Sequence, residues 1–211
     1  MEQVVMDVFE GIVSGKQDVV SDRVTQGLEQ GIPPRVILDD GLIAAMEKVG
    51  ELFERNEFYV PEMLISARAM KAGLEILRPQ LADQQVEATG SVIIGTVQGD
   101  LHDIGKKLVA IMLEGAGFEV KDLGVDISPQ DFITAIKQDG ADILALSALL
   151  TTTMANMETT LKALEEAGLR GQVKVIVGGA PVTQDFADEI GADGFAADAS
   201  LAVKLAKVLV G

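Results

Sequence analysis

The residue best suited to bind a metal ion in this chain is its single histidine, His102. It lies in the segment GDLHDIG, residues 99–105, two positions after Asp100. An imidazole can donate to a transition metal through one ring nitrogen, while its other N–H needs an acceptor that fixes the tautomer. The Asp100 carboxylate is close enough in the chain to be that acceptor. The alternative is that Asp100 caps a following helix and His102 is an ordinary loop residue.

Two later motifs, Ser147-Ala148-Leu149 and Gly178-Gly179, also suit ligand binding. A serine hydroxyl can form a hydrogen bond with a heterocyclic nitrogen, and adjacent glycines let a ligand approach the backbone closely. Each motif also has a common structural explanation, because serines often satisfy strand ends and glycine pairs often turn a chain. If the glycines do face a ligand, a bulky residue at Gly178 or Gly179 should block binding with little loss of folding.

Composition and charge exclude several classes of function. The formal net charge of −16 disfavours binding to nucleic acid or to an anionic membrane surface. With no cysteine, the chain has no disulfide, no cysteinyl iron–sulfur cluster and no thiol nucleophile. No apolar run approaches the roughly 20 residues that cross a bilayer, and the start of the chain lacks the basic region of a signal peptide. We therefore expect a cytoplasmic protein.

From residue 91 onward, short β-branched runs alternate with helical patterns, which predicts a flavodoxin-like α/β domain with a doubly wound parallel sheet of five strands. The predicted strands are 91–97, 118–123, 143–147, 173–177 and 194–196, and the predicted helices are 106–115, 129–138, 154–167, 182–190 and 201–209. Ligands of such sheets bind at the carboxyl ends of the strands. Because each of the three motifs follows a predicted strand, we expect them to converge at this edge.

The amino-terminal part has the periodicity of amphipathic helices and predicts a four-helix bundle. The third helix should begin at Pro34, with an apolar face that includes Leu38 and Leu42, and the fourth should follow Pro61. The first two helices should end at glycines.

A segment without periodicity, residues 82–90, follows the predicted bundle. It separates a part with helical periodicity from a part in which strand and helix patterns alternate. We therefore expect two domains, a helical cap over 1–85 and the α/β domain over 90–211.

Taken together, the motifs Asp-x-His-x-x-Gly, Ser-x-Leu and Gly-Gly resemble the signature of B12-binding domains, as in cobalamin-dependent methionine synthase and methylmalonyl-CoA mutase. The spacing matches this signature as well, because 41 residues (106–146) separate the first motif from the second and 28 residues (150–177) separate the second from the third. The resemblance implies that cobalamin or a related corrinoid binds base-off/His-on, with His102 replacing the cofactor's own lower base on the cobalt.

The resemblance also implies a role for each residue of the signature. The lower base of the cofactor would enter a slot beside the sheet that Ser147, Gly178 and Gly179 line. Thr153 stands where methionine synthase-like domains have a hydroxyl that extends the His–Asp pair, so it would be the third member of a catalytic relay with Asp100 and the histidine. The implied cofactor-binding residues of this domain are Asp100, His102, Asp103, Ile104, Gly105, Ser147, Leu149, Thr151, Gly178 and Gly179.

The predicted helical cap distinguishes between branches of this family. The whole chain, including the segment NEFYVPE at 56–62, resembles the small corrinoid proteins of methanol, methylamine, glycine-betaine and aryl-ether methyltransferase systems. In those proteins a four-helix cap covers the upper face of the corrin. The resemblance implies that Met63, Leu64 and Met70 shield the methyl position, and the alternative is that these residues form the bundle core.

The implied function is that of a methyl carrier. The cobalt would accept a methyl group as Co(I) from a substrate-specific methyltransferase and present it as methyl-Co(III) to a second corrinoid-dependent methyltransferase, with a reductive activation protein as a further partner. No residue pattern indicates a separate catalytic site, so the chain would be a carrier subunit and not an enzyme on its own.

Three alternative functions stay open at the level of sequence. A B12-dependent isomerase subunit should lack the helical cap. A B12-dependent sensor or regulator should add a DNA-binding or signalling segment, and none is evident in these 211 residues. A flavin or nucleotide binder would be distinguished by the absorbance of the purified protein.

Overall fold

The computed structural model describes residues 2–83 and 88–211, so residues 84–87 of the expected linker lie outside the described part. None of the helices in the described part is long and apolar enough to cross a membrane. The chain forms two compact units. The first contains Met1–Glu87 and Gly115–Gly117, and the second contains Ala88–Glu114 and Phe118–Gly211.

The first unit is built from helices, as the sequence predicts. They are α1 (Gln3–Val13), α2 (Gln17–Glu29), α3 (Pro34–Val36), the π-helical segment η1 (Ile37–Ile43), α4 (Ala44–Glu54) and α5 (Val60–Asp83). Apolar side chains on these helices are fully buried, among them Val5, Val8, Ile12, Val20, Val24, Leu42, Met46, Val49 and Leu77. The predicted start of the fourth helix is confirmed, since Pro61 lies in the first turn of α5, where a missing N–H costs no helical hydrogen bond.

The third predicted helix differs from expectation in its first turns. The chain forms α3, then the π-helical segment, then α4, instead of one continuous α-helix from Pro34. The buried residues in this stretch include Ile37 and Leu42, five positions apart, while Leu38 is only partly buried. Residues five apart diverge around the axis of an α-helix, whereas the wider i→i+5 turn of a π-helix keeps them on one face. The expectation that Leu38 lies on the buried face is therefore wrong, and Ile37 takes that place.

The second unit is a five-stranded parallel sheet with the strand order β2-β1-β3-β4-β5, which confirms the flavodoxin-like prediction. Its strands are β1 (Ser91–Thr96), β2 (Glu119–Asp122), β3 (Ile143–Ser147), β4 (Lys174–Gly178) and β5 (Gly194–Ala196). Its helices are α6 (Ile104–Gly115), α7 (Pro129–Asp139), α8 (Thr151–Glu166), α9 (Gln184–Glu189) and α10 (Ala199–Val210). The largest shift from a predicted boundary is at α8, which begins at Thr151 where the sequence pattern begins at residue 154.

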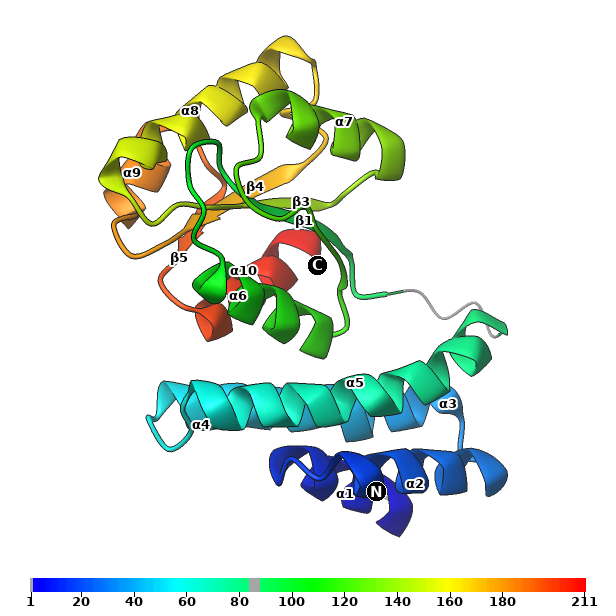
Figure 1. Ribbon diagram of the computed structural model, residues 1–211. Coiled ribbons are helices and arrows are strands. Elements are labelled where there is room, and N and C mark those ends of the chain that lie inside the picture. Colours follow the sequence, from blue (N-terminus) through cyan, green and yellow to red (C-terminus); the bar gives the residue numbers. More distant parts are fainter. Residues whose placement is uncertain (1, 84–87) are drawn as a thin grey trace. The chain divides into compact units, whose positions relative to one another are not determined.

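Helices cover both faces of this sheet (Figure 1), with α6 and α10 on one face and α7, α8 and α9 on the other. Strands β1, β3 and β4 are buried along most of their length, as central strands of a doubly covered sheet should be, while the edge strand β2 is largely exposed. Phe132 of α7 is fully buried in a core with Met157 and Leu161 of α8 and Leu144 of β3. This core fixes the strands whose ends carry the three motifs.

The carboxyl ends of the central strands bring the motifs to one edge. Thr96 at the end of β1 pairs with Ser147 of β3, and Ser147 pairs with Gly178 of β4. Gly178 in turn pairs with Ala196 at the end of β5. The histidine loop that follows β1 therefore begins next to the Ser-x-Leu motif, and the glycine pair lies one strand further along.

Candidate functional site

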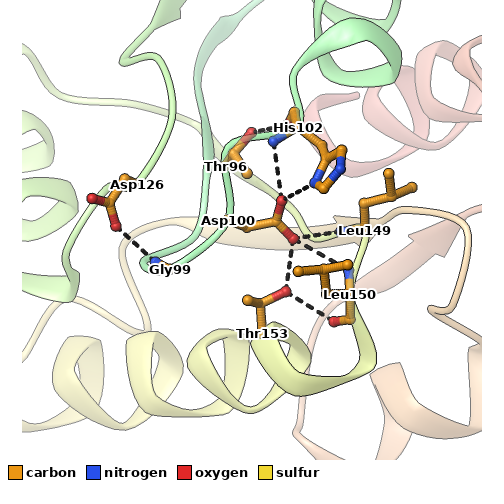
Figure 2. Close-up of polar contacts among 8 residues, drawn as sticks. All are labelled: Thr96, Gly99, Asp100, His102, Asp126, Leu149, Leu150 and Thr153. Atoms are coloured by element: carbon orange, nitrogen blue, oxygen red, sulfur yellow. Dashed lines mark hydrogen bonds and ion pairs between the residues drawn. The ribbon is translucent and has the colours of Figure 1, made fainter.

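His102 stands in the loop between β1 and α6, where its ring contacts Asp100 (Figure 2). His102 Nδ1 lies 2.7 Å from Asp100 Oδ1, and the His102 amide donates to the same oxygen at 3.0 Å. The Asp100 side chain is fully buried, whereas 51% of the His102 side chain is exposed. The inner nitrogen of the ring is therefore anchored while the rest of the ring is open to a ligand.

The second oxygen of the Asp100 carboxylate is held by the start of α8. Asp100 Oδ2 accepts from the amides of Leu149 and Leu150 at 2.8 and 3.2 Å and lies 2.7 Å from Thr153 Oγ1. The hydroxyl proton of Thr153 can donate to this anion or to the Leu150 carbonyl oxygen, and the charged carboxylate is the stronger acceptor. Burial raises the pKa of Asp100, but the hydrogen bonds from Thr153, Leu149 and His102 outweigh it and hold the pKa well below its usual range.

The ionised state of Asp100 determines which nitrogen of His102 carries the proton. A carboxylate accepts hydrogen bonds but cannot donate them, so Nδ1 bears the hydrogen in this contact and Nε2 is the nitrogen left to bind a metal. No described residue forms a hydrogen bond with Nε2. The ring thus presents the nitrogen that a transition metal requires.

Two residues outside the predicted set, Thr96 and Asp126, hold the histidine loop. Thr96 is fully buried, and its Oγ1 donates to the carbonyl oxygen of His102 at 2.9 Å. Asp126 Oδ1 accepts from the amide of Gly99 at 2.7 Å. Their only signals in the sequence are a threonine at a predicted strand end and an aspartate in a loop, and both are common in structures without a site.

The surface next to the histidine is apolar and open. Leu101 and Ile104 are 72% and 76% exposed, and Leu149 and Leu150 are exposed as well. A Cβ at Gly105 would meet no atom within 4 Å. Large exposed apolar side chains beside a single polar group are typical of a ligand-binding surface. These residues would suit the apolar surface of an organic cofactor that binds beside the imidazole.

Ser147 and the glycine pair differ in what surrounds them. Ser147 is partly buried, and its hydroxyl has no hydrogen-bond partner in the part of the chain that the structure describes. Gly179 has a φ of 134°, and a Cβ there would lie 1.9 Å from the carbonyl oxygen of Ala148. The expectation that a bulky residue at Gly179 would leave folding intact is therefore wrong, because the side chain would overlap the backbone. At Gly178 the nearest atom to a Cβ is the carbonyl oxygen of Ala196, at 3.0 Å.

Two further predicted binding residues lie near the starts of the helices that flank the site. Asp103 precedes α6 and forms an ion pair with Lys107 one turn later, and this hydrogen bond lowers the pKa of Asp103. Thr151 is exposed as the first residue of α8. Their contact with a cofactor stays a prediction.

The three residues predicted to shield the methyl position lie on α5 of the helical unit. Met63 and Met70 are buried, while Leu64 is 39% exposed. Burial of both methionines is what their alternative role in a bundle core requires. Shielding stays a prediction for all three.

Comparison with known families identifies the class of protein that this fold and site define. Residues 90–204 match the B12 binding domain family, and residues 6–78 match a second family with the same description, B12 binding domain. The first of these matches spans more than half of the chain. The protein is therefore a B12-binding protein.

Individual relatives narrow this class. Trimethylamine corrinoid protein 2 of Methanosarcina acetivorans is 43% identical to this chain, and the match covers 99% of this chain and 97% of the relative. The structure of the methanol:cobalamin methyltransferase complex MtaBC from Methanosarcina barkeri matches with a TM-score of 0.89 at 28% identity, over 99% of this chain and 80% of that chain. A cobalamin-binding protein from Desulfitobacterium hafniense matches with a TM-score of 0.81 at 30% identity, over 98% of both chains. The chain belongs to the family of B12-binding corrinoid proteins.

Proposed function

We propose that this protein carries a methyl group between two methyltransferases on the cobalt of a corrinoid that is bound base-off/His-on through His102. The observation that carries the proposal is the half-exposed His102 ring, with Nδ1 bonded to the buried carboxylate of Asp100 and with Nε2 left as the donor. A metal-bound histidine whose second nitrogen donates to a carboxylate is a common arrangement in metalloproteins.

When bound, the cobalt supplies the nucleophile that takes up a methyl group and the centre from which it is passed on. The protein residues would hold and orient the histidine that binds it. Asp100, anchored by Thr153 and the Leu149 amide, orients the ring of His102. The same contact between Nδ1 and Asp100 Oδ1 would keep the ring in place in the absence of a metal.

The remaining site residues would bind the organic part of the cofactor. The exposed side chains of Leu101 and Ile104 would hold the corrin ring. Ser147 and the Gly178-Gly179 turn would line the slot for the displaced lower base, where the Ser147 hydroxyl can bond a ring nitrogen.

The relatives support methyltransferases as partners, since one is a trimethylamine corrinoid protein and another structure is a methanol:cobalamin methyltransferase complex. We propose a substrate-specific methyltransferase, a second corrinoid-dependent methyltransferase and a reductive activation protein as the partners of this chain. The match of the helical unit at 6–78 favours a carrier over an isomerase subunit, which should lack that unit. A cytoplasmic location stays a prediction.

The carrier function is tested by following the absorbance of the reduced cobalt in the holoprotein with and without a partner enzyme. A bound cobalt nucleophile needs its methyl donor held in line, and orientation of this kind is a large part of many barriers. We expect no methylation by methylamines or methanol alone, and rapid methylation when the cognate methyltransferase is added. Rapid methylation by a natural donor without a partner would show an autonomous enzyme. A lack of methylation with every methylamine and methanol methyltransferase would contradict the carrier function.

A further inference from the structure

Asp126, in the loop between β2 and α7, has a backbone conformation that demands an explanation. Its φ is +56°, and Asn56 is the only other non-glycine residue of the described chain with a positive φ. This left-handed conformation costs a residue with a side chain about 1 kcal/mol. Such a cost is usually offset by contacts that the conformation makes possible.

In this conformation Asp126 makes two hydrogen bonds to the segment that precedes His102. Its Oδ1 accepts from the amide of Gly99 at 2.7 Å, and its own amide donates to the carbonyl oxygen of Asp100 at 3.0 Å. Figure 2 shows the side chain of Asp126 pointing at Gly99, on the far side of the loop from α8. The backbone of residues 99–100 is therefore bonded to the loop between β2 and α7. The carboxylate of Asp100 is bonded to the start of α8.

The loop that carries Asp126 is itself fixed at its other end. The buried ammonium of Lys106 donates to Asp122 Oδ1 and, at 3.0 Å, to the carbonyl oxygen of Gly124. The same carbonyl oxygen accepts from the amide of Thr96 at 3.0 Å. The loop is thus bonded to α6 and to the end of β1. Asp126 is therefore held in place, and it can in turn hold the backbone of Asp100.

We propose that Asp126 is a positioning residue for the cobalt ligand. It holds the backbone of Asp100 so that the carboxylate keeps its place when the His102 ring binds or leaves the metal. This inference rests on the proposed function, in which His102 is that ligand. Asp126 acts through Asp100 and does not itself touch the metal.

Three substitutions separate the role of the Asp126 acceptor oxygen from that of its left-handed backbone conformation. Asp126→Asn keeps an acceptor oxygen and a residue type that tolerates the left-handed region, Asp126→Gly keeps the backbone conformation but loses the acceptor, and Asp126→Ala loses both. Ser128→Ala is the matched control, because it removes the N-cap of α7 in the same loop without touching residues 99–100.

The first measurement uses the apoprotein, so it does not depend on cofactor binding. Because the chain has one histidine, ¹⁵N-histidine labelling gives the ring nitrogens of His102 alone. We expect Asp126→Gly and Asp126→Ala to speed exchange of the Gly99 amide at least about tenfold and to shift the ring nitrogens toward those of Asp100→Asn. Asp126→Asn should restore the wild-type ring signals, and Ser128→Ala should not change them.

The second measurement is electron paramagnetic resonance of the Co(II) holoprotein. The fraction of the spectrum with histidine nitrogen splitting should fall in Asp126→Gly and recover in Asp126→Asn. If Asp126→Gly speeds Gly99 exchange but leaves the ring signals and the splitting as in Ser128→Ala, Asp126 only stabilises the loop and the proposal is overturned. If the wild-type protein lacks histidine splitting, the proposed function itself fails, which is a separate outcome from a failure at Asp126 alone.

Discussion

At the scale of single residues, Asp100 is the group on which the site depends most. Its buried carboxylate receives hydrogen bonds from the His102 loop and from the start of α8, two segments far apart in the sequence. Loss of the charge would leave these donors around a weaker acceptor. The carboxylate therefore joins the two segments as well as orienting the imidazole.

Asp100→Asn should lower the free energy of unfolding of the apoprotein by at least about 2 kcal/mol near neutral pH, because a buried charged acceptor of several hydrogen bonds is replaced by a neutral amide with one acceptor oxygen. The folded-state pKa of Asp100 lies below that of the unfolded chain, so its stabilisation is complete above the unfolded value and is lost as pH falls through the folded value. The difference in the free energy of unfolding between wild type and Asp100→Asn should therefore become smaller below about pH 4. Denaturant titrations at several pH values measure this, and a difference that widens in acid would contradict the assignment.

His102→Ala should have a different effect, since the ring is half exposed and its loss leaves the Asp100 carboxylate bonded to α8. We expect apoprotein stability within about 1 kcal/mol of wild type, because partly exposed side chains contribute little. Corrinoid binding should weaken but remain detectable, with an altered cobalt spectrum. Fluorescence or absorbance titration with cofactor measures this, and Thr153→Val provides a comparison that keeps the imidazole but removes a donor to Asp100. An unchanged spectrum in His102→Ala would argue against ligation.

At the scale of structural elements, the loops after β1, β3 and β4 build the site. The glycines in these loops have different surroundings, so substitutions at them should have different effects. Gly105 in the first turn of α6 faces open space, while Gly179 after β4 is packed against Ala148.

Gly105→Ala should leave apoprotein stability unchanged or raise it by up to about 1 kcal/mol, because alanine favours the helix. Gly179→Ala should lower stability by about 2 kcal/mol or more, because of backbone overlap and an unfavourable φ. Thermal unfolding of both apoproteins tests this directly. In cofactor titrations, weaker binding by the folded Gly105→Ala protein would indicate a direct contact, and equal stability of the two variants would contradict the packing at Gly179.

The sequence predicts the elements of the α/β unit well because its central strands are continuous apolar runs between strong turn signals, as at Ile143–Ser147. The Asp–His pair is also predictable, since both residues lie in one short loop. The π-helical segment is not, because its five-residue spacing gives no recognised period. Asp126 is missed for a different reason, since its contact with Gly99 spans 27 positions and depends on a backbone conformation that no local pattern specifies.

At the scale of the whole molecule, cofactor binding should be visible as a gain in stability. A ligand that binds only the folded state at about 100 times its dissociation constant adds about 2.7 kcal/mol. Calorimetry with and without corrinoid should show a higher unfolding temperature for the holoprotein and a smaller rise for His102→Ala. An unfolding temperature that does not respond to the corrinoid would argue against a site on the folded chain.

The central claim, that the protein holds cobalt through its own histidine, is tested most directly by electron paramagnetic resonance of the Co(II) holoprotein. Because His102 is the single histidine of the chain, protein labelled with ¹⁵N-histidine changes one candidate ligand and no other imidazole of the protein. We predict that the nitrogen splitting changes from the three-line pattern of ¹⁴N to the two-line pattern of ¹⁵N, with unlabelled cofactor throughout. A spectrum that is unchanged by histidine labelling, and that responds instead to ¹⁵N in the lower base of the corrinoid, would contradict ligation by His102.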